Sequence, residues 1–124
     1  DYGVKKVKTK DGKIMAVNIF DLSGDDDYKL IRKNYFSDAI GCLLVYDVNI
    51  KSTFNNLAKW EQEAELNGLN LKNCIVVLIG NKIDVKSRRE VSTKEGKEYA
   101  TKKGFYFFET SSKTGVATCS LDFT

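Results

Sequence analysis

The 124-residue sequence contains neither histidine nor proline. Without histidine the chain has no Ser-His or Cys-His catalysis and no metal site built from imidazole ligands. Its three cysteines include no Cys-x-x-Cys pair, which indicates free thiols in a reducing compartment and therefore a cytoplasmic location. No apolar run approaches the roughly 18 residues of a membrane-spanning helix.

The sequence also lacks the pattern Gly-x-x-x-x-Gly-Lys-Ser/Thr, which forms a phosphate-binding loop in many nucleotide-binding proteins. Gly-Lys occurs only at Gly12-Lys13 and Gly96-Lys97. Neither pair has a glycine five residues earlier or Ser/Thr next, so neither forms such a loop.

Composition is that of one soluble domain covering residues 1–124, with 42% hydrophobic and 30% charged residues. The net charge of +3 is small, and five lysines between Lys5 and Lys13 make one expected hairpin basic. We interpret these lysines as a solvated edge that resists aggregation, rather than as a nucleic-acid or lipid site.

Hydrophobic periodicity predicts an α/β fold with a mostly parallel sheet and helices on both of its faces. Asp11-Gly12 is a two-residue hairpin signal between two strands. Ser52 and the Ser92–Glu95 capping box mark helix starts, while Gly68 and Gly104 mark helix ends. The expected strands cover residues 4–9, 14–20, 41–48, 74–79 and 105–109, and the expected helices cover about 30–36, 52–67 and 92–103.

Asn81-Lys82-Ile83-Asp84 follows an apolar, β-branched run that ends at Gly80, which predicts a loop at the carboxyl end of a buried strand. Open α/β sheets bind ligands at that edge. Asp84 can accept a hydrogen bond on each carboxylate oxygen, and guanine offers two adjacent donors where adenine does not. The simpler alternatives are an Asx-turn at Asp84, a surface lysine at Lys82 and an ordinary turn residue at Asn81.

A second polar loop, Glu109 to Gly115, follows the apolar run that begins at Phe105. We expect Ser112 and Lys113 to supply backbone and side-chain-stem contacts to the opposite side of a guanine base. Ser111 is expected to fix the loop through its hydroxyl. Two such loops, each behind a strand and in this order, make a specific pattern where one alone is weak.

Asp21-Leu22-Ser23-Gly24 completes the pattern, together with the strand that ends at Asp47. From residue 1 to about 115 the chain resembles a Ras-superfamily small GTPase, and most closely the Rab branch. Asp-Tyr-Gly at the start and Val-Asn-Ile-Phe-Asp before Leu22 resemble Rab-like proteins that carry a J domain. The resemblance implies GTP or GDP with Mg²⁺ as ligands, Asp21 reaching the metal through water, and Gly24 contacting the terminal phosphate through its N–H.

In the resembled family the phosphate loop and first switch precede the point that matches Asp1. We therefore expect a form truncated at its amino-terminal end, without a last helix, and weak or inactive in nucleotide binding. The resemblance implies effector and regulatory proteins as partners, and the exposed sheet edges of a truncated form predict self-association. Leu121 to Thr124 is not a prenylation box, and Cys119 lies too far back to serve in one.

Asp25 stands where the resembled family usually has glutamine, the residue that orients the attacking water. An ionised aspartate cannot donate a hydrogen bond, and it repels a nearby phosphate. This departure predicts slow GTP hydrolysis. Two functions follow as alternatives: a guanine-nucleotide switch in trafficking or signalling, or a pseudo-GTPase that binds proteins without turnover. A third reading is a gene product with no stable function.

Overall fold

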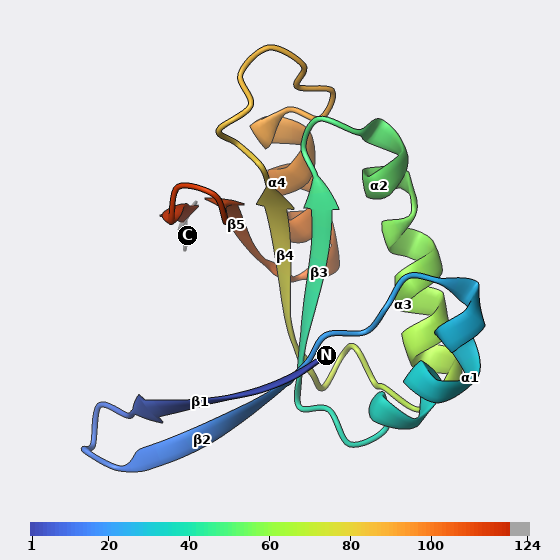
Figure 1. Ribbon diagram of the computed structural model, residues 1–124, viewed down its shortest axis with the longest axis vertical. Helices are drawn as coiled ribbons and strands as arrows, with labels where there is room; N and C mark the ends of the chain where they lie inside the picture. Colours follow the sequence, from blue (N-terminus) through green and yellow to red (C-terminus); the bar gives the residue numbers. More distant parts are fainter. Residues whose placement is uncertain (120–124) are drawn as a thin grey trace.

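The computed structural model describes residues 1–119 (Figure 1). Strands and helices alternate after an initial hairpin, as the periodicity predicts, and the segment 26–35 forms short helical turns. The strands are β1 (Tyr2–Lys8), β2 (Ile14–Phe20), β3 (Gly41–Asp47), β4 (Ile75–Asn81), β5 (Tyr106–Ser111) and β6 (Val116–Cys119). The helices are η1 (Asp26–Tyr28), α1 (Lys29–Arg32), η2 (Lys33–Tyr35), α2 (Lys51–Asn55), α3 (Leu57–Leu66) and α4 (Thr93–Lys103).

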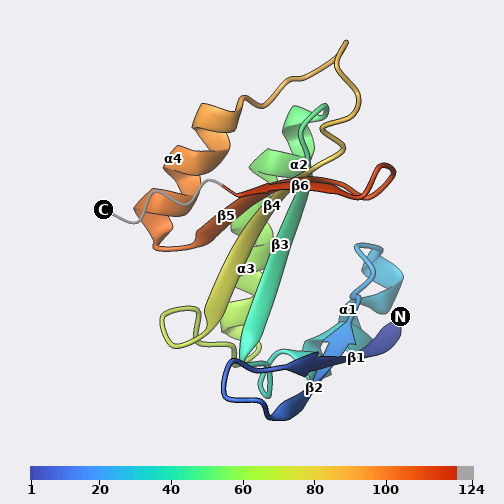
Figure 2. The same cartoon turned by 90° about the vertical axis from the view of Figure 1, so that its left-hand side faces the viewer.

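The main sheet has the strand order β3-β4-β5-β6. The first three strands are parallel, and β6 returns antiparallel to β5 (Figure 2). The α/β class and the mostly parallel sheet are therefore confirmed. The strand β6 was not expected from the sequence, and β5 runs to Ser111, beyond the expected end at residue 109.

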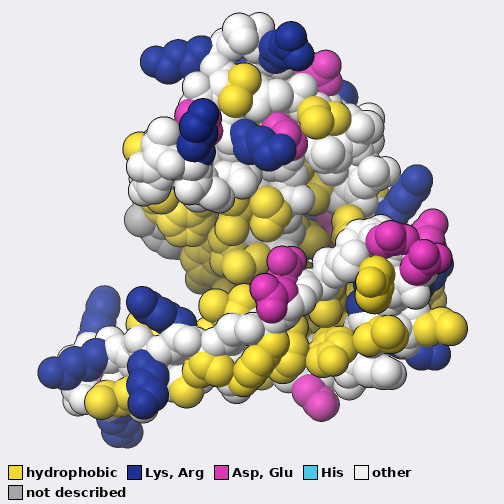
Figure 3. Space-filling model, viewed as in Figure 1, with side chains coloured by type: hydrophobic (Ala, Val, Ile, Leu, Met, Phe, Trp, Pro, Cys, Tyr) yellow, Lys and Arg dark blue, Asp and Glu magenta, His cyan; other side chains and the backbone are white. Residues whose placement is uncertain are grey.

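One face of the sheet forms the core. Leu44 and Leu78 point into it and are 7% and 0% exposed, while Leu43 and Ile75 on the opposite face are 59% and 64% exposed. Within residues 1–119, α2, α3 and α4 lie on the core side, and hydrophobic side chains gather on the open face above the hairpin (Figures 1 and 3). The expected second layer of helices is not seen in these residues, and β3 is buried on one side only.

Helix ends follow local sequence in α4 and depart from it in α2. Ser92 and Glu95 form the expected capping box, and Gly104 ends the helix in the left-handed region at φ 74°. Ser52, however, lies inside α2, whose N-cap residue is Ile50. The nearby hydroxyl of Thr53 instead accepts a hydrogen bond from the Asp47 amide at 2.9 Å and ties the helix to the end of β3.

The hairpin β1–β2 forms a separate two-stranded sheet, and every residue of both strands is exposed. Its turn is not the expected two-residue type. The Gly12 amide donates to the Thr9 carbonyl, the Thr9 amide donates to Lys13, and Gly12 has φ 84°, which describes a three-residue turn with a glycine bulge. Phe20 connects the hairpin to the helical segment through Tyr35, with ring centroids 5.0 Å apart.

The three cysteines are free: Cys42 and Cys74 are half-buried against the core, and Cys119 is exposed. Burial raises the pKa of the Cys42 thiol to about 11, so this side chain is an unreactive packing group. None of the helices in residues 1–119 has the length and apolar character needed to cross a lipid bilayer. The expectation for residues Leu121 to Thr124 falls outside the described residues.

Candidate functional site

The carboxyl ends of three parallel strands meet at one edge of the sheet. Asp47 at the end of β3 is in register with Asn81 at the end of β4, and Asn81 is in register with Thr110 of β5. Because the three strands end at the same level, the loops that follow them lie side by side. Open α/β sheets bind ligands at this edge.

Asn81 joins the two loops that the sequence singles out. Its side-chain oxygen accepts hydrogen bonds from the Thr110 hydroxyl at 3.0 Å, the Ser112 amide at 3.2 Å and the Ser112 hydroxyl at 3.3 Å. A side-chain oxygen with three donors from the neighbouring strand end holds both loops in one arrangement. The contacts with Ser112 cross the site and bring residues 81–84 next to residues 111–113.

Asp84 is oriented by a buried hydroxyl. Ser111, only 2% exposed, donates to Asp84 Oδ1 at 2.6 Å and accepts from the Thr114 amide at 3.1 Å. The hydrogen bond from Ser111 lowers the pKa of Asp84, and the charges of Lys113 and Lys82 act in the same direction. Asp84 is therefore ionised at neutral pH. A carboxylate has about four acceptor positions, so it keeps room for two donors of a ligand.

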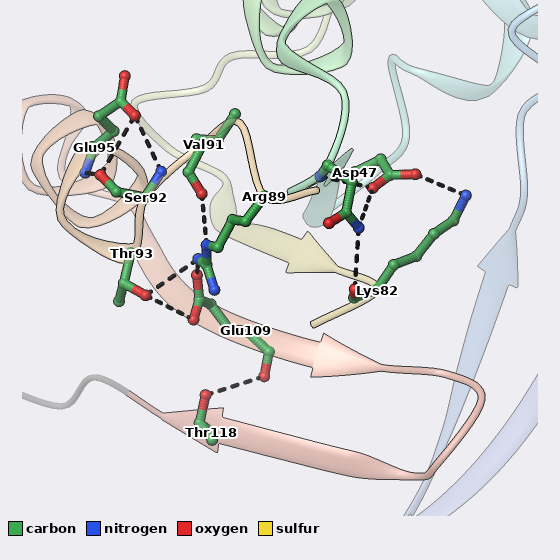
Figure 4. Close-up of polar contacts among 10 residues, drawn as sticks. Asp47, Lys82, Arg89, Val91, Ser92, Thr93, Glu95, Glu109 and Thr118 are labelled. Atoms are coloured by element: carbon green, nitrogen blue, oxygen red, sulfur yellow. Dashed lines mark hydrogen bonds and ion pairs between the residues drawn. The ribbon is translucent and has the colours of Figure 1, made fainter. Parts of the chain in front are cut away.

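Asp47, which the sequence did not indicate as a site residue, holds the Lys82 side chain. The Lys82 backbone is in the left-handed region at φ 68°, and its ammonium nitrogen lies 2.8 Å from Asp47 Oδ2. Asn49 donates to Asp47 Oδ1 at 3.0 Å and to the Lys82 carbonyl at 3.2 Å. Figure 4 shows the lysine side chain stretched toward Asp47 between the ends of β3 and β4. The contact with Asp47 raises the pKa of Lys82, which keeps the ammonium charged.

A second polar cluster, also unexpected, fixes the loop between β4 and α4. Arg89 pairs with Glu109, which is 6% exposed, and donates from Nε to the Val91 carbonyl at 2.7 Å. The Thr93 hydroxyl donates to Glu109 at 3.0 Å (Figure 4). A glutamate inside the apolar run of β5 was the available signal, because a buried carboxylate requires partners. The cluster therefore holds this loop against β5.

Asp21, Gly24 and Asp25 lie on a different segment, between β2 and η1. Asp25 caps η1, since its carboxylate accepts a hydrogen bond from the Asp27 amide at 3.1 Å. Within residues 1–119, no hydrogen bond or ion pair given by the structure joins this segment to Asn81–Asp84. The structure thus gathers Asn81, Lys82, Asp84 and 111–113 into one site and leaves Asp21, Gly24 and Asp25 outside it.

The residues present fit the base of a guanine nucleotide better than its phosphates. The oriented carboxylate of Asp84 suits a base that offers two adjacent donors. For phosphates, the 124 residues contain no Gly-Lys-Ser/Thr loop. No group of three or more Cys, Asp or Glu residues that could hold a metal ion occurs in residues 1–119, so Asp21 would have to act with ligands from elsewhere.

The α/β fold, with two polar loops side by side at the ends of parallel strands, is that of the small GTPase class. A sequence model of the Ras family matches residues 1–120, and the chain belongs to this family. It is 40% identical over 118 residues to a zebrafish (Danio rerio) protein named DnaJ homolog subfamily C member 27, and the match covers 93% of this chain. The chain spans 43% of the length of that relative. The expected Ras-superfamily, Rab-like resemblance is confirmed.

Proposed function

We propose that this domain recognises the guanine base of GTP or GDP through Asp84, with Ser112 and Lys113 on the opposite side of the base. The observation that carries the proposal is the hydrogen-bond network that links Asn81 to Ser112 and Asp84 to Ser111. It orients an ionised carboxylate before any ligand arrives, which reduces the cost of ordering on binding. Lys82 would keep its pair with Asp47 and lay its methylene stem along the base plane.

We expect this chain to bind the base of a nucleotide but to have little affinity for its phosphates. Backbone N–H groups of a phosphate loop and its lysine supply much of the electrostatic hold on a nucleotide, and this sequence contains no such loop. We therefore propose that the 124-residue chain binds guanine nucleotides weakly. Mg²⁺ would enter with phosphates, near Asp21 and Gly24, only where a phosphate loop is supplied.

The first prediction concerns the base alone. In a nuclear magnetic resonance titration of the isotope-labelled chain, guanosine monophosphate is expected to shift the amide signals of residues 81–84 and 111–113. Adenosine monophosphate at the same concentration should move them by a small fraction of that, because Asp84 would face a base without two adjacent donors. Equal shifts with the two nucleotides, or shifts confined to other loops, would contradict the proposal.

A pseudo-GTPase that binds proteins without turnover is the second candidate. It is favoured by Asp25, whose carboxylate caps η1 and, when ionised, has no proton to donate to a water-positioning hydrogen bond. An interaction surface is available on the adjacent segment. The rings of Tyr2, Phe20 and Tyr35 form a chain with centroids 5.0 Å apart and are 58%, 48% and 42% exposed. Exposed aromatic clusters of this kind are typical of protein-binding sites.

For either function we propose effector or regulatory proteins as partners, and we propose that they bind at this aromatic cluster. The free thiols of Cys42 and Cys74 support a cytoplasmic location for either function. Assignment to vesicle trafficking or signalling rests on family membership and is part of the same proposal.

A further inference from the structure

Arg32 of α1 holds the segment that carries Gly24 and Asp25. Its side chain is 5% exposed overall, and Nη1 donates to the Ser23 carbonyl at 3.0 Å and to the Asp25 carbonyl at 2.8 Å. Two carbonyls separated by one residue are thus held by one nitrogen. This leaves the segment little freedom to change its backbone direction without breaking charge-assisted hydrogen bonds.

The other side of the same guanidinium is anchored to α3. Nε and Nη2 of Arg32 donate to the two carboxylate oxygens of Glu63 at 2.6 and 2.9 Å, in the paired geometry that arginine and carboxylates favour. The hydrogen bond from Arg32 lowers the pKa of Glu63, so the carboxylate is charged. The pair is nearly enclosed, with side chains 6% and 16% exposed, and is therefore screened much less than a surface pair.

Trp60 completes the contact. The Arg32 guanidinium lies 4.9 Å from the centroid of the Trp60 ring, and a Cβ built on Gly24 would meet Trp60 Cζ2 at 3.6 Å. The glycine of the Asp-x-x-Gly motif therefore rests beside the tryptophan that the arginine covers. All of these contacts come from α1 and α3 of this chain, and none requires a phosphate.

We propose that Arg32 is a positioning residue that holds Ser23–Asp25 in one ordered conformation whether or not nucleotide is present. The inference extends the proposed function, because it makes the surface of η1 and α1 a constant feature rather than one that nucleotide creates. It concerns the ligand-free chain, so it can fail or succeed independently of guanine recognition.

Amide hydrogen exchange of the ligand-free chain tests the inference. Asp27 and Tyr28 donate their amides to Asp25, so we expect both to exchange at least about tenfold more slowly than in an unstructured peptide. Addition of GDP with Mg²⁺ should change these rates by less than about twofold. Arg32→Gln should remove most of the protection, whereas Lys33→Gln, an exposed neighbour, should leave it intact.

Two further readouts separate positioning from general stability. Protection of the β4 amides should be unchanged in Arg32→Gln, and fluorescence of Trp60, the only tryptophan, should shift in that variant and not with nucleotide. If Arg32→Gln also loosens β4, Glu63→Gln decides the question, because it keeps the packing and removes the charged partner. The inference would be overturned if the Asp27 and Tyr28 amides were unprotected in the unmodified chain or became protected only with nucleotide. Full protection of these amides in both Arg32→Gln and Glu63→Gln would also overturn it.

Discussion

Asp84→Asn is expected to lower the preference of this chain for guanine over adenine by about tenfold or more. Asparagine keeps the size of the side chain and replaces one acceptor oxygen with an NH₂ donor. That donor would face the ring N–H or exocyclic amine of guanine, so one hydrogen bond is lost and two donors oppose each other. Ser111 can still donate to the remaining oxygen, so the loop should keep its shape.

The measurement is the ratio of guanosine to adenosine monophosphate affinities from chemical-shift titrations of both chains. Asp38→Asn is the matched control, because Asp38 is an exposed aspartate remote in sequence from both loops, and its only described hydrogen bond is with Ser37. We expect the control to keep the preference of the unmodified chain. If Asp84→Asn prefers guanine to the same degree as the unmodified chain, the Asp84 carboxylate does not take part in base recognition.

We expect the unmodified chain to form a dimer through β3 and Val45→Lys to keep it monomeric. β3 is an edge strand of the main sheet, and within residues 1–119 no strand pairs with the side that faces away from β4. It carries no lysine, proline or bulge that would protect the edge, and its outward-facing residues Leu43 and Val45 are 59% and 55% exposed. In contrast, β1 has three lysines, which would repel a second copy. We propose that two copies pair through β3.

Sedimentation or light scattering over a range of chain concentrations measures this effect. The unmodified chain should show a dimer at high micromolar concentration, and a charged side chain on the edge strand should abolish it. Ile75→Lys is the control, because Ile75 is 64% exposed on the same face but lies on the interior strand β4. A monomeric unmodified chain would exclude the pairing. Loss of the dimer in Ile75→Lys as well would indicate contact between sheet faces instead.

The loops of the candidate site could be predicted from the sequence because strand ends are local features. The apolar run before Gly80 indicates that β4 ends close to this point; the strand continues to Asn81, and Lys82-Ile83-Asp84 follow it as a loop. The partners within the site depend on which strands lie side by side, as β3 and β4 do, and the sequence around one loop does not specify its neighbours. For this reason the roles of Asp47 and Asn49 as partners of Lys82 were not expected.

Tertiary packing also decides features that the local pattern leaves open. Gly96 lies within α4, where glycine is unfavourable, and a Cβ there would come within 2.3 Å of the Tyr46 hydroxyl. That close approach across the core accounts for the glycine. Arg32 appeared as one polar residue in a helical segment, and its contacts with Glu63 across 31 residues of sequence emerge only in the folded chain.

We propose that this chain recognises the guanine base and binds the phosphates only weakly. Titration of the chain with GDP, in the presence and absence of Mg²⁺ and beside ADP, tests it most directly. We predict millimolar affinity for GDP, about −4 kcal/mol, with weaker binding of ADP and no dependence on Mg²⁺. Tight, Mg²⁺-dependent binding of GDP would show that the chain contacts the phosphates and would contradict the proposal. Equal affinities for GDP and ADP would contradict recognition of guanine.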